Sequence, residues 1–321
     1  MRKYSIIIPV YNRPDEINEL LESLTRQTYR NFEVLVIEDG SKLTCQHMVE
    51  QFAGQLEIRY YFKENSGQGF SRNYGFTLAK GDYFVIFDSD CLIPEHYFAT
   101  VDAYLNTHYL DAYGGPDRAH PNFSPIQKAI SYSMTSLFTT GGIRGNKKRV
   151  GGAFHPRSFN MGLSRKVYET VGGYVITRMG EDIIYTINII KHGFTTGLIE
   201  DAYVYHKRRT NFRQFFKQLH FFGRARINIS RFYPKELKLV HIFPALFTLA
   251  SFSIPLLSLF STPLYQLALS LFILYFLLIL LDATIKNKSL EVGLLSIIAV
   301  FVQLVGYGIG FLTEGWRKLR E

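Results

Sequence analysis

The sequence predicts an α/β fold with a doubly wound sheet, followed by a membrane region, and two observations carry this prediction. Over the first part of the chain, apolar runs rich in β-forming residues alternate with segments whose apolar residues recur at helical spacing. Farther on, charged residues nearly vanish between Leu239 and Thr313, although they make up 20% of the 321 residues. We therefore expect one domain over residues 1–238 and a membrane region over residues 239–321.

The predicted elements follow one another without an internal repeat over the first 90 residues. Residues 4–10 (YSIIIPV) form an almost wholly apolar run, which is typical of a buried strand. Pro14 and the helical spacing of Ile17, Leu20 and Leu24 predict a helix directly after it. The predicted order is strand 4–10, helix 15–27, strand 32–37, helix 46–52, strand 58–62, helix 69–79 and strand 82–87. Such alternation implies parallel strands with helices between them.

The middle of the chain has a less regular pattern. Residues 114–157 mix glycine, proline and basic residues, and we expect a mobile loop within residues 141–152. Glycine is a common stop at the C-terminal end of a helix, so Gly193 should end the helix before it. The remaining predicted elements are a strand at 159–162, a helix at 167–171, a helix at 181–192 and a strand at 202–205.

Three apolar stretches follow, at residues 239–260, 264–281 and 292–312, and each approaches the roughly 20 residues that cross a bilayer. The first contains Pro244 and Pro255 and could be interfacial or re-entrant, so the sequence allows either two or three spans. Three spans would put the basic C-terminal tail outside, against the tendency of basic residues to stay inside. If only the two later stretches cross, the tail lies on the cytoplasmic side, but Lys286 and Lys288 between those stretches lie outside.

Charge and cysteine content narrow the partners and the compartment. The net charge of +9 gathers at residues 144–149 and 207–231, and the second cluster runs into the apolar region. Anionic lipid headgroups and a diphosphate are therefore favoured over nucleic acid as partners. Cys45 and Cys91 have neither metal-ligand spacing nor a disulfide framework, which fits a reduced, cytoplasmic domain. Because the first strand begins directly after Lys3, no signal peptide is expected.

The triplet Asp88-Ser89-Asp90 is the most informative motif, because it follows a predicted buried strand. Ligands bind at the carboxyl ends of the strands in open α/β sheets. Two neighbouring carboxylates repel one another unless a cation lies between them, and Mg²⁺ or Mn²⁺ suits their oxygens. Taken alone, the triplet is better explained as a polar turn.

Three further segments bear polar groups that could act in a site, although each also has a purely structural explanation. Glu38-Asp39-Gly40-Ser41 follows the second strand and should emerge at the same edge as Asp88. Residues 65–73 place glycines before a helix whose N-terminus can receive a phosphate. Glu181 and Asp182 begin a predicted helix. They could stabilise its N-terminus as capping residues, or one of them could act as a general base.

In their order and spacing, these segments together resemble family 2 glycosyltransferases, which have the GT-A fold. The resemblance covers residues 4–226. It rests on residues 7–13 (IIPVYNR), residues 38–41 (EDGS), residues 67–73 (GQGFSRN), residues 88–90 (DSD) and residues 180–182 (GED). The resemblance implies an inverting transferase that uses a nucleotide-diphospho-sugar and a GT-A-type mixed sheet.

The resemblance also implies roles in donor binding. Pro9 and Tyr11 would line the nucleotide pocket, and Asp39 would contact the nucleobase, usually uracil. Arg72 would help to hold the donor phosphate or ribose, and Asp88 would lie near the ribose or the metal.

Metal binding and catalysis are assigned in the same way. Asp90 would ligate Mn²⁺ or Mg²⁺, with Asp88 close by, and His206 resembles a late histidine that ligates the metal in some members. Asp182 would be the catalytic base, with Glu181 beside it. The acceptor would be a hydroxyl of a membrane-associated or lipid-linked glycan, at the bacterial inner membrane with the catalytic domain in the cytoplasm, for cell-surface polysaccharide synthesis.

Two other functions compete with this one. In a polyprenyl-phosphate sugar transferase the acceptor is a phosphate, which needs little deprotonation. A membrane-anchored nucleotide-sugar binding protein would have no turnover, which the intact set of acids argues against. The Gln-x-x-Arg-Trp motif of the processive synthases is absent, since residues 218–222 read QLHFF, so addition of a single sugar is expected.

Overall fold

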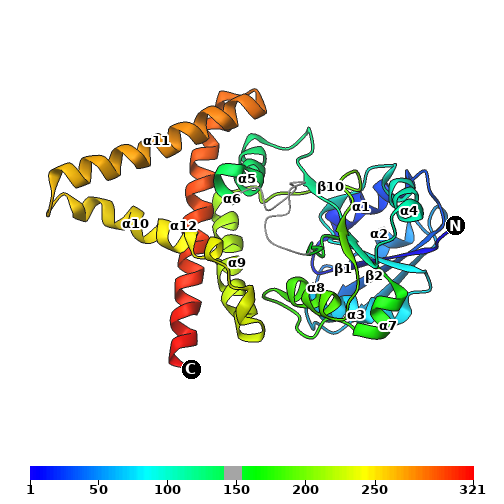
Figure 1. Ribbon diagram of the computed structural model, residues 1–321. Coiled ribbons are helices and arrows are strands. Elements are labelled where there is room, and N and C mark those ends of the chain that lie inside the picture. The colour runs from blue at the N-terminus through cyan, green and yellow to red at the C-terminus, as the bar shows by residue number, and fades with distance from the viewer. Residues whose placement is uncertain (141–153) are drawn as a thin grey trace. The chain divides into compact units, whose positions relative to one another are not determined.

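The computed structural model of the chain describes residues 1–140 and 154–321 (Figure 1). The expected mobile loop at 141–152 and the basic cluster at 144–149 lie outside the described residues. By packing, the chain divides into two compact units, residues 1–120 with 147–207, and residues 121–146 with 208–321. The amino-acid composition changes at residue 238 instead, and the domain boundary there stays a prediction.

The first unit contains a seven-stranded mixed sheet in the order β3-β2-β1-β4-β8-β6-β9. Strands β1 to β4 are parallel, while β8 runs antiparallel to both β4 and β6. The strands are β1 (Tyr4–Val10), β2 (Phe32–Asp39), β3 (Ile58–Lys63), β4 (Tyr83–Phe87), β6 (Ala112–Gly114), β8 (Asn160–Ser164) and β9 (Thr196–Leu198). A second sheet joins β5 (Cys91–Leu92), β10 (Val204–His206) and β7 (Asp117–Arg118). The predicted α/β class with a doubly wound, mixed sheet is confirmed.

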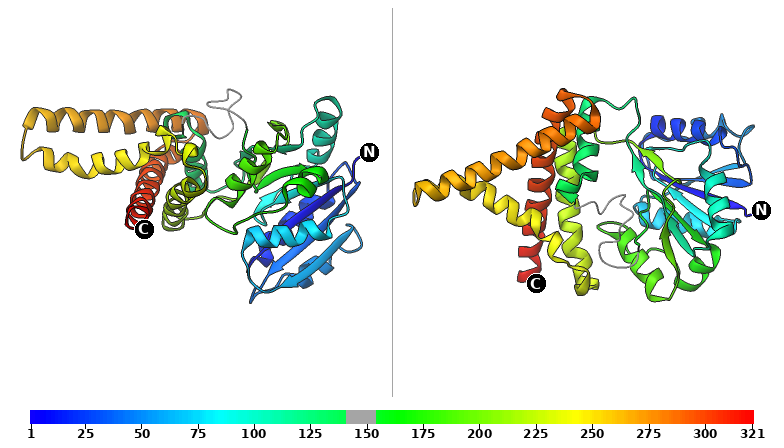
Figure 2. Two further views of the ribbon diagram at one scale, coloured as in Figure 1. Left: turned by 60° about the horizontal axis from the view of Figure 1, so that its bottom comes forward. Right: turned by 45° about the horizontal axis from the view of Figure 1, so that its top comes forward.

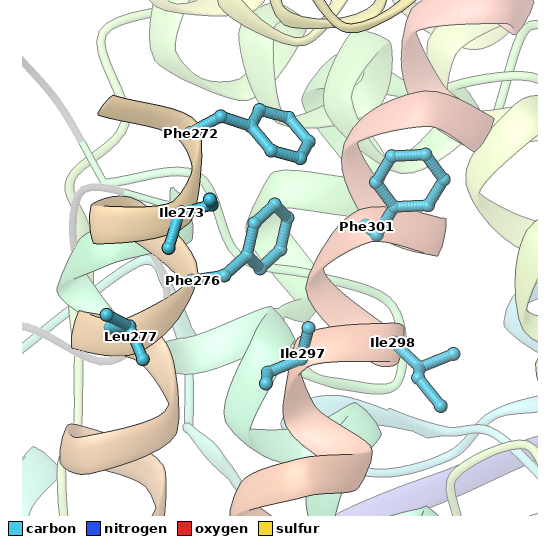
Figure 3. A pocket seen from close by; sticks show the side chains of 7 residues that line it. All are labelled: Phe272, Ile273, Phe276, Leu277, Ile297, Ile298 and Phe301. Carbon is cyan, nitrogen blue, oxygen red and sulfur yellow. The ribbon is translucent and has the colours of Figure 1, made fainter. Parts of the chain in front are cut away.

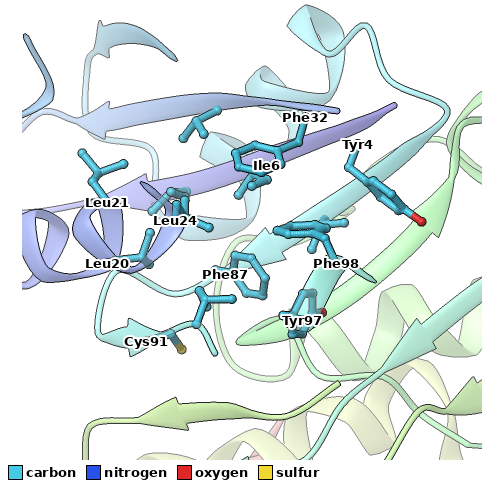
Figure 4. Close-up of a cluster of buried hydrophobic side chains, with 14 of the residues drawn as sticks. Tyr4, Ile6, Leu20, Leu21, Leu24, Phe32, Phe87, Cys91, Tyr97 and Phe98 are labelled. Carbon is cyan, nitrogen blue, oxygen red and sulfur yellow. The ribbon is translucent and has the colours of Figure 1, made fainter. Parts of the chain in front are cut away.

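Helices cover both faces of the large sheet, and the alternation of side chains along each strand explains why. Ile6 of β1 faces a core that includes Leu20 and Phe98 from two helices on one side (Figure 4). Its neighbour Ile7 faces the other core, with Phe76 from a helix on the opposite side. The helices of this unit are α1 (Pro14–Thr25), α2 (Gln46–Glu50), α3 (Gln68–Leu78), α4 (Tyr97–Thr107), α7 (Arg165–Val171) and α8 (Glu181–Lys191).

Several elements were not predicted from the sequence, and each omission has a physical reason. Helix α4 contains tyrosine, phenylalanine, threonine and valine, which are weak helix formers, so packing of Tyr97, Phe98 and Val101 in the core decides its conformation. Strands β5, β6, β7 and β9 have only two or three residues and show no periodicity. The sequence predicted a strand at 202–205 with His206 after it. In the structure His206 is the last residue of β10.

The second unit is wholly helical among its described residues. It contains α5 (Pro125–Thr135), α6 (Leu137–Thr140), α9 (Phe212–Phe232), η1 (Pro234–Glu236), η2 (Leu239–His241), α10 (Phe243–Leu257), α11 (Thr262–Asn287) and α12 (Leu290–Arg320). Three segments are long and apolar enough to cross a membrane, namely Leu239–Leu257, Thr262–Asn287 and Leu290–Arg320. The three predicted apolar stretches are therefore helices. Helix α5 falls in a region for which no regular element was expected.

Truncation of Phe98 should destabilise the first unit. Its ring is fully buried and lies within 5.4 Å of the rings of Tyr4, Phe32 and Tyr97, measured between ring centres. We expect Phe98→Ala to lower the free energy of unfolding by about 3–5 kcal/mol, because it leaves a cavity. Denaturant unfolding of the detergent-solubilised chain measures this change. The control is Phe62→Ala on the exposed side of β3, where we expect a change within about 0.5 kcal/mol.

Candidate active site

The carboxyl ends of β2, β1 and β4 meet at one edge of the sheet, because the three strands are neighbours and run parallel. Pro9 is the next-to-last residue of β1, and Tyr11, whose ring is exposed, follows the strand. Asn12 joins the loops after β1 and β2. Its side-chain oxygen accepts hydrogen bonds from the backbone N–H groups of Lys42 (2.8 Å) and Leu43 (3.1 Å). The two loops therefore form one rim around this edge.

Asp39 ends β2 and already has several hydrogen-bond donors. Its Oδ1 accepts from Lys63 Nζ (2.6 Å) and the backbone N–H of Ser66 (2.9 Å), and its Oδ2 accepts from the N–H of Gly67 (2.8 Å). Burial would raise the pKa of Asp39, but these bonds outweigh it and hold the pKa below its usual range. These bonds engage both oxygens of the carboxylate, and the Asp39 side chain is only 5% exposed.

Glu38, next to Asp39, has a structural role. Its side chain is buried and accepts hydrogen bonds from the Ser41 hydroxyl and from the backbone N–H of Cys45 (2.7 Å). It therefore closes the turn after β2, and only Asp39 of this acidic pair is directed to the loop before α3.

Arg72 on α3 lies at the centre of the acidic groups. Its side chain is only 1% exposed, and its two terminal nitrogens bind different carboxylates. One nitrogen donates to Asp88 Oδ1 at 2.8 Å, and the other to Glu181 Oε1 at 3.4 Å. The guanidinium also lies 5.5 Å from the centre of the Tyr174 ring. Arg72 thus links the end of β4 to the start of α8, and it stands within the protein rather than at its surface.

Asp90 lies beside His206 because of a pairing between distant segments. Strand β10 runs antiparallel to β5 and pairs His206 with Cys91, the residue after Asp90. Asp90 Oδ1 lies 3.1 Å from His206 Nε2, and Asp90 Oδ2 accepts a hydrogen bond from Arg13 at 2.7 Å. Burial opposes ionisation of Asp90, but His206 and Arg13 hold its pKa well below the usual range.

These side chains fit a divalent cation. Asp90, Cys91 and His206 each offer a ligand atom, and the three atoms lie within 4.8 Å of one another. Ligands held about 2.1 Å from an octahedral ion are separated by about 3 Å, which matches the 3.1 Å between Asp90 and His206. Burial raises the pKa of the Cys91 thiol, so oxygen and nitrogen are the donors here. Asp88 is not a member of this cluster.

Glu181 and Asp182 begin α8 but differ in environment. Gly180 before them has φ +98°, a conformation that favours glycine. The Glu181 side chain is 6% exposed and binds Gln68 and Arg72, and burial together with the neighbouring Asp182 raises its pKa. The Asp182 side chain is 20% exposed, and its Oδ2 accepts from Arg157 at 3.2 Å. Of the two acids, Asp182 is the more accessible to a substrate.

Sequence reasoning missed the partners of the predicted acids. Arg13 follows β1 and Lys63 ends β3, so both could have been found from their place at the edge that carries the acids. Arg157 precedes β8 and had no recognisable signal. Asn73 follows Arg72 on α3, and its amide binds the backbone of Tyr174, at 2.7 and 2.9 Å.

The mixed sheet with acids at one edge is of the GT-A type, the fold of a class of glycosyltransferases. The family model described as "Glycosyl transferase family 2" matches residues 5–172, which is more than half of the chain. The chain therefore belongs to glycosyl transferase family 2, and the resemblance found in the sequence is confirmed.

Curated relatives match a short part of the chain. Glycosyltransferase GlyG of Streptococcus pneumoniae is 32% identical over 99 residues, which cover 30% of this chain and 33% of GlyG. The poly(ribitol-phosphate) beta-N-acetylglucosaminyltransferase TarS of Staphylococcus aureus is 32% identical over 115 residues, which cover 35% of this chain and 20% of TarS. The chain thus spans a third or less of these relatives.

Solved structures establish the fold over a larger part of the chain. The mannosyltransferase PcManGT of Pyrobaculum calidifontis, in complex with GDP-Man and Mn²⁺, has a TM-score of 0.72 at 15% identity. The alignment covers 99% of this chain and 88% of that protein. Residues 1–349 of S. aureus TarS, in complex with UDP-GlcNAc, have a TM-score of 0.50 at 19% identity, covering 70% of this chain and 67% of that one.

Removal of the Arg72 charge should unfold the acidic edge. Arg72→Met keeps the length of the side chain but leaves buried Glu181 without its counter-charge. Breaking a buried pair in this way costs about 3–5 kcal/mol in the free energy of unfolding. Denaturant unfolding should show this loss, whereas the exposed control Arg178→Met should change little. Equal stability of the two variants would contradict the central role of Arg72.

Proposed function

We propose that the chain transfers a sugar from a nucleotide-diphospho-sugar to a hydroxyl group of a membrane-associated acceptor, with inversion at the anomeric carbon. The observation that carries this proposal is the shared contact of Asp88 and Glu181 with one buried guanidinium. This contact brings the acids after β4 together with the acids at the start of α8. A metal-binding acid and a base on opposite sides of a reacting sugar are what direct displacement requires.

The donor would be bound along the edge of the sheet by groups that are already ordered. Pro9 and Tyr11 would flank the nucleotide, and Asp39 would accept a hydrogen bond from the nucleobase or the ribose. Arg72 would act mainly by orienting Asp88, because both of its terminal nitrogens bind carboxylates. UDP-GlcNAc in TarS and GDP-Man in PcManGT support this class of donor.

Asp90 and His206 would hold Mn²⁺ or Mg²⁺, and the complex of PcManGT with Mn²⁺ supports this assignment. The ion, when bound, would neutralise the negative charge on the leaving diphosphate. Arg13 would keep one oxygen of Asp90 occupied, so that the other faces His206 and the ion. Asp88, one residue before Ser89, would contact the ribose or complete the ligand set through a water molecule.

Asp182 would take the proton from the acceptor hydroxyl as its oxygen attacks the anomeric carbon. The bond from that carbon to the diphosphate oxygen breaks in the same step, so no covalent intermediate with the protein forms. Arg157 holds Asp182 Oδ2 and fixes the direction of the carboxylate. Glu181, which is buried, would support the helix start and not touch the acceptor.

The three apolar helices favour an acceptor at a membrane surface, such as a lipid-linked glycan used for cell-surface polysaccharide. We place the protein in the bacterial inner membrane, with the catalytic domain in the cytoplasm where nucleotide sugars are made. The two buried, free cysteines are compatible with that reducing compartment.

One observation favours a second acceptor class, the phosphate of a polyprenyl lipid. Arg157 is about one-third exposed beside Asp182 and could bind an anionic acceptor. A phosphate oxygen is already ionised near neutral pH, so no general base is needed. The two functions therefore differ in how much they depend on Asp182.

Turnover should depend on a divalent metal. We expect purified protein to release nucleotide from one of a set of UDP- and GDP-sugars in the presence of Mn²⁺ or Mg²⁺. EDTA should abolish the release, and added metal should restore it, because Asp90 and His206 alone do not neutralise a diphosphate. Release that persists in EDTA would contradict the metal assignment. Donor binding with no release under any condition would favour a non-catalytic binding protein.

Asp182→Asn should separate the two acceptor classes. It keeps the shape of the side chain but removes its basicity, and general base catalysis contributes about 10²–10⁴-fold. For a hydroxyl acceptor we expect kcat to fall in that range, with donor affinity and thermal stability nearly unchanged. Asp201→Asn, an exposed acid of the same unit, is the control. Wild-type turnover of Asp182→Asn would overturn the hydroxyl mechanism and favour the phosphate acceptor.

A further inference from the structure

The three apolar helices of the second unit differ sharply in how much of their surface the protein itself covers. Protein buries 11% of the most apolar window of Leu239–Leu257 and 6% of that of Thr262–Asn287, but 56% of that of Leu290–Arg320. Hydropathy alone does not separate these helices, since their windows have values of 1.8, 2.4 and 2.2. The difference in burial indicates that α12 has a different environment from α10 and α11.

Helices α10 and α11 form a hairpin that extends away from α9 and α12 (Figures 1 and 2). From Leu239 to Leu281 the chain has no Asp, Glu, Lys or Arg, and the turn between the helices is equally uncharged. Large apolar side chains such as Phe260, Leu267 and Leu274 are exposed on the hairpin. At 1.5 Å per residue, 19 and 26 residues extend about 28 and 39 Å, close to or beyond the roughly 30 Å of bilayer hydrocarbon.

Helix α9 covers the C-terminal half of α12 in continuous register. A Cβ on Gly306 would lie 3.2 Å from Phe216, one on Gly310 would lie 2.1 Å from the carbonyl oxygen of His220, and one on Gly315 would lie 4.0 Å from Ile227. The helices therefore run side by side in the same direction. Helix α9 carries Arg213, Lys217, Arg224, Arg226 and Arg231, and such residues are the costliest to place at the centre of a bilayer.

Ion pairs hold the C-terminal end of α12 to the same basic helix. The buried carboxylate of Glu314 accepts from Arg224 (2.9 Å) and Arg231 (2.8 Å). Four residues after Glu314, Lys318 Nζ donates to Ser230 Oγ at 3.0 Å. Wherever α9 lies, residues 302–320 of α12 must lie with it.

The N-terminal half of α12 is covered by α5, which belongs to the part of the chain before the hairpin. Ala129, Ile130 and Met134 of α5 pack in one apolar cluster with Val292 and Ala299 of α12. Helix α5 also contains Gln127, Lys128 and several hydroxyl-bearing residues, so it is not a membrane-crossing segment. Polar or basic helices thus accompany α12 along its whole length.

The exposed large side chains of α12 form an apolar stripe at the two ends of the helix, and residues 299–311 between them are not exposed. At 100° per residue its exposed large side chains fall within one 80° sector of the helix. They are Leu290, Leu294, Ile298, Leu312, Trp316 and Leu319. A helix with one apolar face, an opposite face carried on polar partners and a tryptophan near its end is typical of the plane of the membrane interface.

A groove of about 420 Å³ lies between α11 and α12, beside this stripe (Figure 3). Seven apolar side chains line it, including Phe272, Phe276 and Phe301. Hydrocarbon is the solvent that such a surface requires, so the bilayer begins at the junction of the hairpin with α12.

We propose that α10 and α11 are the two segments that cross the bilayer, and that α12 lies with α9 along one membrane surface. The bases of the hairpin, α12 and the C-terminus are then all on one side. This arrangement leaves the uncharged turn at 258–261 on the other side. The basic residues of the region are gathered on the side of the C-terminus, namely Lys235, Lys238, Lys286, Lys288, Arg317, Lys318 and Arg320.

The other two arrangements each conflict with an observation. If all three apolar helices crossed, α12 would draw α9 and its five cations into the hydrocarbon. If only α11 and α12 crossed, the same conflict would arise, and Lys286 and Lys288 would face the opposite side from the tail.

Cysteine labelling distinguishes the three arrangements. The native Cys45 and Cys91 are both buried, so the wild-type chain should not react with a membrane-impermeant maleimide and serves as the blank. Single cysteines are introduced at the turn by Phe260→Cys, between α11 and α12 by Lys288→Cys, and at the C-terminus by Glu321→Cys. Gly54→Cys, at an open surface position of the first unit, reports the side on which that unit lies.

The full-length variants are expressed in bacteria and labelled in intact spheroplasts and after permeabilisation. We expect Phe260→Cys to react in intact spheroplasts, and the other three variants to react only after permeabilisation, with at least a tenfold difference in labelling. Because the test compares sides with Gly54→Cys, it does not depend on enzymatic activity. Gel filtration of each variant in detergent verifies that it is folded.

Each other pattern overturns the proposal. Glu321→Cys on the side opposite Gly54→Cys would mean three crossings. Lys288→Cys opposite Gly54→Cys would mean that α11 and α12 are the spans. Failure of Phe260→Cys to react in intact spheroplasts, when it reacts in detergent, would mean that the hairpin does not reach the far surface.

Discussion

The buried guanidinium of Arg72 is the contact on which the arrangement of the acidic edge depends. A cation that is 1% exposed is costly unless carboxylates surround it, and it draws Asp88 from the end of β4 and Glu181 from the start of α8 to one point. Asp182 directly follows Glu181 at the start of α8, so the same contact sets where Asp182 stands. The acids after β4 and the acids at the start of α8 are thereby held in fixed positions relative to one another.

Three acids of the site each have a cation of their own, whereas Asp88 and Glu181 share Arg72. Lys63 binds Asp39, Arg13 binds Asp90, and Arg157 binds Asp182, in each case at one oxygen. Other groups lie against the second oxygens, namely the N–H of Gly67 at Asp39, His206 at Asp90 and the N–H of Ile183 at Asp182. Such preorganisation lowers the cost of reorientation during the reaction, which is a large part of enzymatic electrostatics. The pairing also holds the pKa values of Asp39 and Asp90 below their usual range.

The sequence was sufficient for the strands that lead to the site but not for the contacts that complete it. Buried runs such as residues 83–87 are recognisable from composition, and parallel topology then places Asp39 and Asp88 at one edge. The approach of His206 to Asp90 depends instead on pairing of two very short strands, separated by over 100 residues. Arg157 lies in a segment with no periodic pattern, and hydropathy could not distinguish α12 from α10 and α11, because the difference lies in what packs against them.

The interleaved order of the second unit has a consequence for how the chain is made. Helix α5 ends at Thr135, yet its partner α12 begins only at Leu290 and finishes at the last residues of the chain. At about 5–20 residues per second, the ribosome adds the intervening segment on the order of ten seconds after α5 emerges. During that interval the apolar sides of α5 and α9 have no final partner, so premature termination before α12 would yield a nascent chain prone to aggregation or proteolysis, even though every residue of the candidate active site had already been synthesised.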